Sequence, residues 1–341
     1  MKLLVTGGAG FIGSNFIRYW LKKYPADKIV NLDKLTYAGN LENLKDVEDN
    51  PHYEFVKGDI CNFSLVNNLV KKFSPEVIVN FAAESHNSWA IINPTVFFKT
   101  NVLGTQTLLE VARQNKVPRF HHISTCEVYG DLALDSKEKF TENSPYHPNT
   151  PYNASKAASD LVVRAYFTTY QLPVTISNCS NNYGPYQFPE KLIPLFVTNL
   201  LDGLKVPLYK SSQNRREWLY VEDHCRAIDL IIKKGRFGET YNIGSGVEKS
   251  VEEITDIILK ELKMPQSMKI YVEDRPSHDR RYLLGCSKIR RELNWKPQVK
   301  FEEGIKFTIN WYRKNRKWWE PLKKKLNISE ANWGRKKSST K

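Results

Sequence analysis

Residues 2 to 13 read Lys-Leu-Leu-Val-Thr-Gly-Gly-Ala-Gly-Phe-Ile-Gly, an apolar run followed at once by glycines. The apolar half predicts a buried strand, and the residues after it carry the periodicity of a helix. Glycines at a strand-to-helix turn are typical of a dinucleotide-binding motif. Gly8 is expected to allow the tight turn, Gly10 to admit a pyrophosphate, and Gly13 to let helix and sheet pack closely.

Asp33 ends the second expected strand, twenty residues after Gly13. An acidic side chain at this place accepts hydrogen bonds from the adenosine ribose and disfavours a 2′-phosphate, so we expect the cofactor to be NAD. Asp59 and Ile60 follow the third expected strand and are candidates to flank the adenine. An acidic turn residue would fit the sequence at Asp59 equally well.

Short apolar runs alternate with longer helical patterns through the first half of the chain. We expect strands at Lys2–Thr6, Lys28–Leu32, Tyr53–Val56, Val77–Phe81, Phe120–Ser124 and Val174–Asn178, and helices at 11–23, 64–73, 95–115 and 151–170. This alternation is typical of βαβ units. The sequence therefore predicts an α/β protein with a Rossmann-type doubly wound parallel sheet and a smaller C-terminal α/β domain.

The pattern loosens into turns after residue 178. We expect an NAD-binding Rossmann domain over residues 1–178. Residues 216–248 contain two further strand-like runs, Trp218–Val221 and Thr240–Ile243, and are expected to return to this domain. The remaining segments, residues 179–215 and 249–325, should form a substrate-binding domain, followed by a basic tail at 326–341.

Composition bounds the class of protein. No apolar run in the 341 residues reaches the roughly 20 needed to cross a bilayer, so we expect a cytoplasmic protein without a membrane partner. The five cysteines lack metal-ligand spacing, which predicts free thiols in a reducing compartment and no metal. The net charge is +14, but residues 313–341 contribute +9 of it and leave about +5 for the rest. No nucleic-acid partner is expected.

Tyr152 and Lys156 are four residues apart and therefore face the same side of an expected helix. A lysine ammonium beside a phenol lowers the pKa of the tyrosine, as a general base requires. Alone, such a pair is a weak signal, because most instances lie on helix surfaces. Behind the glycine motif and the strand end at Ser124-Thr125, it completes a constellation typical of short-chain dehydrogenase/reductases.

On these residues the chain resembles an extended short-chain dehydrogenase/reductase, and it is most similar to the dTDP-glucose 4,6-dehydratase family. The similarity covers about residues 2 to 315 in one register. It is carried by Asp33–Asn40, Ala82–His86, Glu127–Gly130, Asn178–Pro185, Pro189–Pro194, Trp218–His224 and Asp274–Tyr282.

The resemblance implies catalytic roles. Tyr152, supported by Lys156, would take the proton of the sugar 4-hydroxyl while NAD accepts the carbon 4 hydride, and Thr125 would hydrogen-bond the same oxygen. Glu127 matches the base that removes the carbon 5 proton. Cys126 occupies the place of the aspartic acid that protonates the departing 6-hydroxyl, before the hydride returns to carbon 6.

The resemblance also implies binding residues and a homodimer. The cofactor-binding set is Gly7, Gly10, Phe11, Ile12, Gly13, Asp33, Asp59, Ile60, Ala82, Tyr152 and Lys156. The set for the nucleotide sugar is Ser85, His86, Asn181, Lys191, Leu192, Pro207, Arg216, Arg275 and His278. Within the second set, arginine and histidine side chains suit diphosphate oxygens. Dimerisation is expected through the helix of Tyr152, whose apolar stripe includes Leu161, Val162 and Tyr166, although core burial would produce the same stripe.

Two features depart from the family pattern. A Cys126 thiol, with a pKa of about 8.5, is a weaker acid than a carboxyl group, so elimination is expected to be slower without being lost. The loop after His86 reads Asn87-Ser88-Trp89-Ala90 in place of Val-Asp-Arg-Ser, which favours a changed hexose or product.

The sequence leaves two alternatives open. UDP-GlcNAc 5,6-dehydratases resemble this chain in their Cys-Glu pair, and in that chemistry the hydride returns to carbon 4 and leaves a 5,6-alkene. A catalytically silent NAD-binding protein that docks a partner through its basic tail is the other alternative. A silent protein has no use for Glu127, so the sequence favours a dehydratase. The nucleotide base and the hexose stay open.

Overall fold

The first half of the chain builds a parallel seven-stranded sheet. The structure, a computed structural model, describes residues 1–274 and 277–325. The strand order is β10-β6-β5-β4-β1-β2-β3, and every neighbouring pair is parallel. The strands are β1 (Lys2–Thr6), β2 (Lys28–Asp33), β3 (Tyr53–Lys57), β4 (Val77–Asn80), β5 (Phe120–Thr125), β6 (Val174–Cys179) and β10 (Thr240–Ile243). The order reverses beside β1, which confirms the doubly wound Rossmann arrangement.

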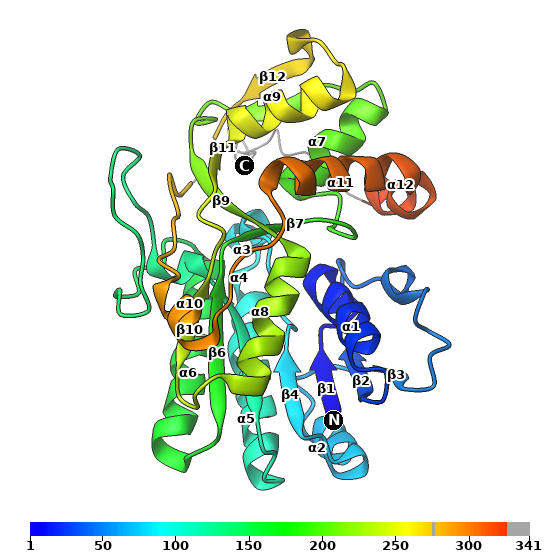
Figure 1. Ribbon diagram of the computed structural model, residues 1–341, viewed down its shortest axis with the longest axis vertical. Coiled ribbons are helices and arrows are strands. Elements are labelled where there is room, and N and C mark those ends of the chain that lie inside the picture. The colour runs from blue at the N-terminus through cyan, green and yellow to red at the C-terminus, as the bar shows by residue number, and fades with distance from the viewer. Residues whose placement is uncertain (275–276, 326–341) are drawn as a thin grey trace, which may run out of the picture.

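Helices cover both faces of this sheet (Figure 1). Helices α1 (Phe11–Lys23) and α8 (Val221–Lys234) pack on one face, and α2 (Phe63–Phe73), α5 (Thr105–Gln114) and α6 (Pro151–Tyr170) pack on the other. Each face buries its own apolar cluster against the strands. Coverage of both faces explains why the central strands read as continuous apolar runs rather than as an alternating pattern.

Two stretches on one side of the site differ from the sequence prediction. The expected helix at 95–115 consists of α4 (Pro94–Phe97), a π-helical segment η2 (Phe98–Gly104) and α5. The π turn places Asn101 so that its side-chain amide donates to the Ser155 hydroxyl on α6, at 2.8 Å. The expected loop after His86 is a short helix, α3 (Asn87–Ile92).

A second lobe stands above the carboxyl ends of the first-sheet strands (Figure 1). It holds a three-stranded sheet in the order β11-β9-β7 and a parallel pair, β12-β8. Its strands are β7 (Asn181–Tyr183), β8 (Val206–Tyr209), β9 (Arg215–Tyr220), β11 (Glu248–Ser250) and β12 (Lys269–Val272), and its helices are α7 (Leu192–Leu201), α9 (Val251–Leu262), α11 (Phe301–Lys314) and α12 (Arg316–Lys324). The short elements η1 (Leu41–Leu44), η3 (Cys126–Tyr129), η4 (Gln266–Met268) and α10 (Ser287–Leu293) complete the list.

The segment 216–248 contributes to both lobes. Strand β10 pairs with β6 in the large sheet, whereas β9 pairs with β7 and β11 in the second lobe. The proposed domain boundaries are therefore compatible with a chain that crosses between lobes more than once, and the division itself stays a prediction. The predicted basic tail, 326–341, lies outside the described residues. Within the described ranges, no helix combines the length and apolarity needed to span a bilayer.

Candidate active site

A cavity of about 310 Å³ lies where the carboxyl ends of the large sheet meet the second lobe. Such an edge of an α/β sheet is where ligands bind, because loops from both sides of the strand-order reversal converge there. Sixteen predicted site residues line it: Gly7, Gly10, Phe11, Ile12, Gly13, Asp33, Asp59, Ile60, Ala82, Ser85, Thr125, Glu127, Tyr152, Lys156, Asn181 and Lys191. The fold therefore brings residues that are up to 184 positions apart in the sequence together around one cavity.

The glycine turn presents backbone rather than side chains to the cavity. Gly7 has φ +69°, and a Cβ there would come within 2.5 Å of the Ala82 nitrogen. The left-handed position of the turn is therefore Gly7, so the assignment of that role to Gly8 was wrong. At Gly10 a Cβ would meet only the Gly7 carbonyl, at 3.3 Å, which leaves the open side of the turn accessible to a diphosphate.

Asp33 braces this turn from the end of β2. Its carboxylate accepts hydrogen bonds from the backbone amides of Ala9 (2.9 Å) and Leu35 (2.8 Å). Burial raises the pKa of Asp33, and these two amides oppose the effect. A carboxylate at the cavity wall, a glycine cradle and a helix N-terminus are what the ribose and diphosphate of NAD require, so these residues fit the expected cofactor.

Asp59 lines the same end of the cavity and is paired to Lys34 at 2.8 Å. Desolvation raises the pKa of Asp59, but the Lys34 ammonium outweighs it and holds the pKa below its usual value. The Asp59 carboxylate also accepts the Cys61 amide at 2.9 Å. These contacts suit an acidic turn residue, and they leave the proposed adenine contact at Ile60 and Asp59 as a prediction.

The end of β5 carries three expected catalytic residues. Thr125 is the last strand residue, and its hydroxyl caps η3 by accepting the Glu127 amide at 3.3 Å. Thr125 and Glu127 both line the cavity. Cys126, between them, is not among the lining residues, and its side chain packs in an apolar cluster with Tyr129, Cys179 and Leu219.

Burial raises the pKa of the Cys126 thiol well above its ordinary value, and the neighbouring Glu127 carboxylate adds to the effect. The thiol is thus fully protonated at neutral pH. It is also a poorer acid than the sequence analysis assumed, because the driving force for giving up its proton falls as its pKa rises. The proposed acid role is the least favoured of the catalytic assignments on this geometry.

Helix α6 begins at Pro151, and its N-cap Thr150 accepts the Asn153 amide at 3.2 Å. Tyr152 and Lys156 therefore lie one turn apart at the buried start of a well-capped helix. Burial raises the pKa of Tyr152 well above its usual value, and the Glu127 carboxylate raises it further. The expected net lowering of this pKa by Lys156 is not seen, because burial outweighs it.

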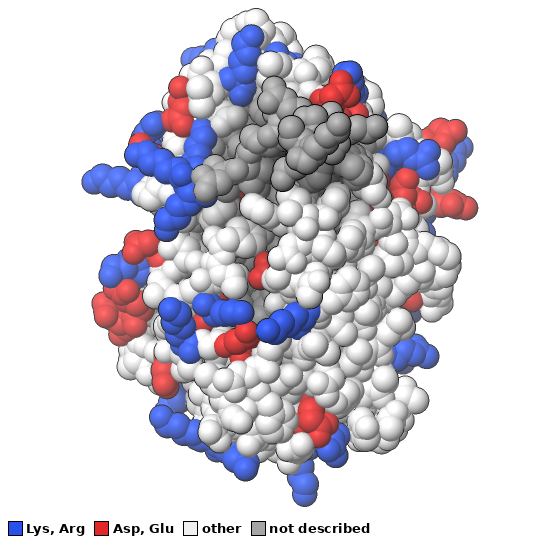
Figure 2. Space-filling view, turned by 180° about the vertical axis from the view of Figure 1, so that it is seen from behind, with Lys and Arg blue, Asp and Glu red and all other residues white. Residues whose placement is uncertain are grey.

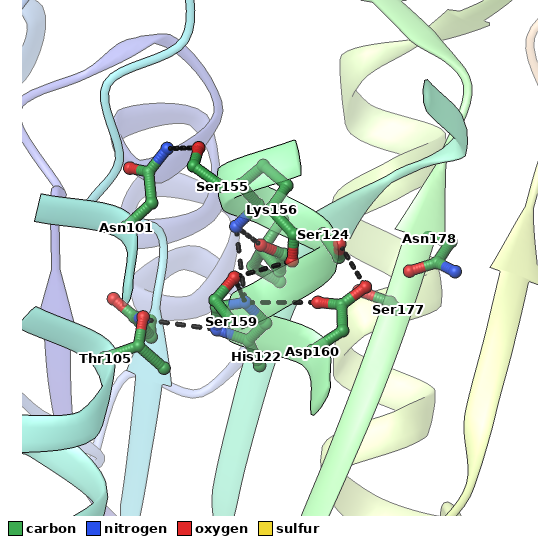
Figure 3. Close-up of polar contacts among 12 residues, drawn as sticks. Asn101, Thr105, His122, Ser124, Ser155, Lys156, Ser159, Asp160, Ser177 and Asn178 are labelled. Carbon is green, nitrogen blue, oxygen red and sulfur yellow. Dashed lines mark hydrogen bonds and ion pairs between the residues drawn. The ribbon is translucent and has the colours of Figure 1, made fainter. Parts of the chain in front are cut away.

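The physical reason lies in the partners of Lys156, shown in Figure 3. Its ammonium donates to the Ile123 carbonyl at 2.8 Å and lies 3.2 Å from the His122 ring. Burial lowers the pKa of Lys156 to about 8, although the Asp160 carboxylate opposes this. The ammonium is thus held beneath the strand end rather than against the phenol.

Behind Lys156 lies a buried polar network that no sequence motif indicates (Figure 3). The His122 ring is 3.4 Å from Asp160, whose carboxylate also accepts the hydroxyls of Ser124 (2.7 Å) and Tyr146 (3.1 Å). Burial raises the pKa of Asp160 to about 6, with Lys156 opposing. The lysine is held in place because it lies in a fully buried network with a histidine and an aspartate, whose remaining hydrogen bonds come from other buried groups.

Part of the predicted substrate set meets at the cavity. Lys191 donates from its ammonium to the Ser85 carbonyl at 2.9 Å, and both residues line the space together with Asn181. His86 is buried beside this wall as the N-cap of α3, where its ring accepts the Trp89 amide. Leu192 starts α7 and packs into the core of the second lobe instead of lining the cavity.

The other members lie further into the second lobe. The Arg216 guanidinium donates to the carbonyls of Arg215, Arg280 and Asp279, at 2.8, 3.2 and 2.7 Å. His278 contacts the side chains of Ser211 (3.0 Å) and Asn214 (3.3 Å). Neither lines the cavity, and nor does Pro207 on β8. Arg275 lies outside the described residues.

Two glutamates of this cavity were missed by the sequence reasoning. Glu84 and Glu190 both line it and are both buried. Burial raises the pKa of each, and the nearby cations Lys34 and Lys191, respectively, oppose the shift. Both glutamates stand inside segments that carried the family resemblance, and acidic residues in such segments were the available signal.

Comparison with known proteins agrees with this geometry. The family model described as GDP-mannose 4,6 dehydratase matches residues 4–308. The chain is 48% identical to a dTDP-glucose 4,6-dehydratase of Haemophilus influenzae, covering 92% of this chain and 98% of that one, and 50% identical to one of Streptomyces niveus, covering 95% and 96%. The crystal structure of a dTDP-glucose 4,6-dehydratase from Streptomyces venezuelae, with NAD and dTDP bound, superposes with a TM-score of 0.92 at 53% identity, covering 94% of this chain and all of that one.

Proposed function

The chain belongs to the dTDP-glucose 4,6-dehydratase family, and from this premise we propose that it converts dTDP-glucose to dTDP-4-keto-6-deoxyglucose with NAD as cofactor. It is then a hydro-lyase that acts on a nucleoside-diphosphate hexose. The observation that carries the proposal is the convergence of Thr125, Glu127, Tyr152 and Lys156 on one cavity that the glycine turn also lines. An epimerase needs the tyrosine and the lysine, but it has no use for Glu127.

The residues divide the reaction into three parts. Bound NAD supplies a hydride acceptor at carbon 4 and a hydride donor at carbon 6. Tyr152 takes the proton of the 4-hydroxyl, and a positively charged cofactor ring bound in this cavity would oppose the rise in its pKa that burial causes. Thr125 hydrogen-bonds the same oxygen and holds it toward Tyr152.

The 4-ketone then acidifies the proton on carbon 5. Glu127, which lines the cavity, removes this proton and later returns one to carbon 5. In this proposal the Cys126 thiol supplies the proton on which the 6-hydroxyl leaves as water. Since the pKa of this thiol is raised, we expect elimination rather than oxidation to limit the rate.

The second lobe is proposed to bind the nucleotide. Arg216 lies on β9 and His278 follows β12 in the chain, whereas Lys191 and Asn181 of the same proposed set line the cavity. Arg216 and His278 reach a diphosphate only if part of their present hydrogen bonding is exchanged for phosphate oxygens. This assignment keeps residues 179–215 and 249–325 as the nucleotide-sugar-binding domain.

The substrate test uses the purified protein with dTDP-glucose, UDP-glucose and UDP-GlcNAc in separate incubations. Products are identified by mass spectrometry and proton NMR in deuterium oxide. The expected result is a 4-keto-6-deoxy sugar from dTDP-glucose with deuterium at carbon 5. A 5,6-alkene from UDP-GlcNAc would overturn the proposal in favour of the related 5,6-dehydratase chemistry, and bound NAD without turnover would point to a silent protein.

A homodimer and a cytoplasmic location complete the proposal. Exposed apolar side chains gather on the neighbouring helical segments of one side, at Ile92, Val96, Phe98, Leu103 and Leu161. Figure 2 shows a broad area of few charges on the face behind Figure 1, as a subunit interface would require. In the predicted stripe Leu161 is exposed, whereas Tyr166 is buried in the core. Five free cysteines support a reducing compartment.

A further inference from the structure

Asn87, the first residue of α3, joins the expected base to the start of α6. Its side-chain amide nitrogen donates to Glu127 Oε2 at 2.9 Å, and its amide oxygen accepts from Thr150 Oγ1 at 2.7 Å. Glu127 lines the cavity, whereas Asn87 and Thr150 do not. Asn87 thus contacts the carboxylate without itself lining the cavity.

The direction of these hydrogen bonds is fixed. The Thr150 hydroxyl accepts the Asn153 amide at the first turn of α6, so its own proton is free to point at Asn87. A carboxylate accepts only, so the Asn87 group facing Glu127 must be its NH₂. The hydrogen-bond donors of Thr150 and Asn87 therefore both point toward Glu127. The positive end of the α6 dipole lies at Thr150, where this series of hydrogen bonds begins.

The N-terminal end of α6, where this series of hydrogen bonds begins, is hydrogen-bonded to the second lobe. The side-chain amides of Asn149 and Asn153 donate to the two carboxylate oxygens of Asp279, at 2.8 and 3.2 Å. The Asp279 backbone carbonyl in turn accepts Arg216 at 2.7 Å. The orientation of Glu127 is thus braced on elements from both lobes rather than on its own short helix.

We propose that Asn87 is a positioning residue for Glu127, holding its carboxylate ionised and turned toward carbon 5 of the sugar for the elimination step. The inference rests on the proposed function, because it assigns Glu127 the role of base. It adds a residue that none of the catalytic assignments above includes. It also separates the two halves of the reaction, since oxidation at carbon 4 does not use Glu127.

Four titratable groups that the Glu127 charge influences are uncharged at neutral pH. They are the thiols of Cys126 and Cys179 and the phenols of Tyr152 and Tyr282. Burial raises the pKa of all four, and the Glu127 charge raises them further. Arg216 is a cation that acts on two of the same groups, Cys126 and Tyr282, and the Asn87 amide adds a hydrogen-bond donor aimed at the Glu127 carboxylate itself.

The first test replaces Asn87 with leucine, which has a similar shape and no donor. Mixing with dTDP-glucose should reduce bound NAD at the wild-type rate, whereas elimination, followed as deuterium uptake at carbon 5, should slow by about 10-fold or more. Without the donor the pKa of Glu127 rises, so the acid limb of the elimination rate should move to higher pH. A merely structural role would slow both steps together and leave the limb in place.

A second pair of variants tests whether the Thr150 hydroxyl orients the Asn87 amide toward Glu127. Thr150→Ser keeps the hydroxyl and should match the wild type, whereas Thr150→Val should show the same split between oxidation and elimination as Asn87→Leu. Ser250→Ala is the control for loss of a helix cap, because Ser250 caps α9 in the second lobe. It should lower the melting temperature without separating the two steps.

Asn87→Asp gives the clearest prediction of the direction in which the acid limb of the elimination rate moves. Two carboxyl groups 2.9 Å apart must share a proton, so the acid limb should move to higher pH by more than in the leucine variant. Infrared difference spectra against Glu127→Gln follow the protonated carboxyl directly and need no turnover. An unmoved limb and unmoved spectra in both Asn87 variants would overturn the inference. No oxidation of dTDP-glucose by the wild type would instead contradict the proposed function.

Discussion

The cavity has two walls, which differ in what positions their functional groups. The backbone wall is formed by the Gly7–Gly13 turn with Asp33, and the side-chain wall by Thr125–Glu127 with Tyr152 and Lys156. In the backbone wall, the predicted cofactor contacts are peptide groups and one carboxylate, so a local sequence is sufficient. In the side-chain wall, every functional group depends on partners from distant elements.

The difference teaches where substitution is tolerated. The backbone wall fails when a side chain is added at Gly7, because the Phe81–Ala82 peptide lies within 3 Å of the position that a Cβ would take. The side-chain wall fails when a partner is removed, because Lys156 and Glu127 are each held by hydrogen bonds from other elements. The following changes test this contrast from the largest expected effect to the smallest.

Tyr152→Phe should have the largest effect, because it removes the proposed base while keeping the ring. Turnover of dTDP-glucose should fall by roughly 10²- to 10⁴-fold, as expected for loss of a general base. The measurement is the steady-state rate, with circular dichroism to check folding. Tyr24→Phe is the matched control, because the Tyr24 hydroxyl contacts Asp229 of α8 and neither residue lines the cavity, so turnover should not change. Equal turnover rates in the two variants would show that Tyr152 is not the general base.

Gly7→Ala tests the backbone wall. Alanine at position 7 would have to adopt a left-handed φ, and its Cβ would lie 2.5 Å from the Ala82 nitrogen. We therefore expect the folded state to lose about 3 kcal/mol of stability and NAD binding to be lost. Gly246→Ala separates strain from collision, because it has φ +81° with no heavy atom within 4 Å of the added carbon. Its cost should be about 1 kcal/mol. Thermal melts with and without NAD measure both, and similar losses would show that contact with Ala82 is unimportant.

Asp160→Asn tests the network behind the side-chain wall. The folded pKa of Asp160, about 6, lies above its ordinary value of 3.8. The folded state therefore binds the proton more tightly, and this contribution is fully present below pH 3.8 and lost as the pH rises through 6. The stability of the wild type relative to the variant should fall by up to roughly 3 kcal/mol across this window. Urea unfolding of both proteins from pH 4 to 7 measures it, and a constant difference would contradict the burial of this charge.

Cys126→Ala should have the smallest effect on turnover. A thiol of raised pKa is a weak donor, so its removal should slow elimination by about 10-fold and leave oxidation at carbon 4 unchanged. Product formation and cofactor absorbance after rapid mixing separate the two steps. A loss beyond 100-fold would show that the thiol is a much stronger acid in the complex than its buried surroundings indicate.

The regular part of the fold could be predicted from the sequence. Strands β1 to β6 lie within a residue or two of their expected positions, and α1 and α6 match exactly in extent. Fully buried parallel strands and long capped helices have strong local signals. The second lobe was not predicted in detail, because short strands such as β7 and β11 are three residues long and have almost no periodicity.

The site shows the same division. The glycine turn, Asp33, Tyr152 and Lys156 line one cavity, as their combined motifs predicted, although the left-handed glycine is Gly7. The helical start at Asn87 and the π turn at Asn101 could not, since both depend on contacts with α6 rather than on local propensity. The pKa of Tyr152 was predicted with the wrong sign for the same reason.

By itself, the sequence determined the class of fold, the backbone wall and the residue types of the catalytic set, because these depend on periodicity, glycine geometry and fixed spacing along a helix. The tertiary structure alone decided the partners of those residues. Lys156 is directed at the Ile123 carbonyl and His122, Cys126 is buried outside the cavity lining, and Asn87 is turned toward Glu127. Hydrogen-bond direction and desolvation belong to neighbours in space, and no local pattern encodes which neighbours those will be.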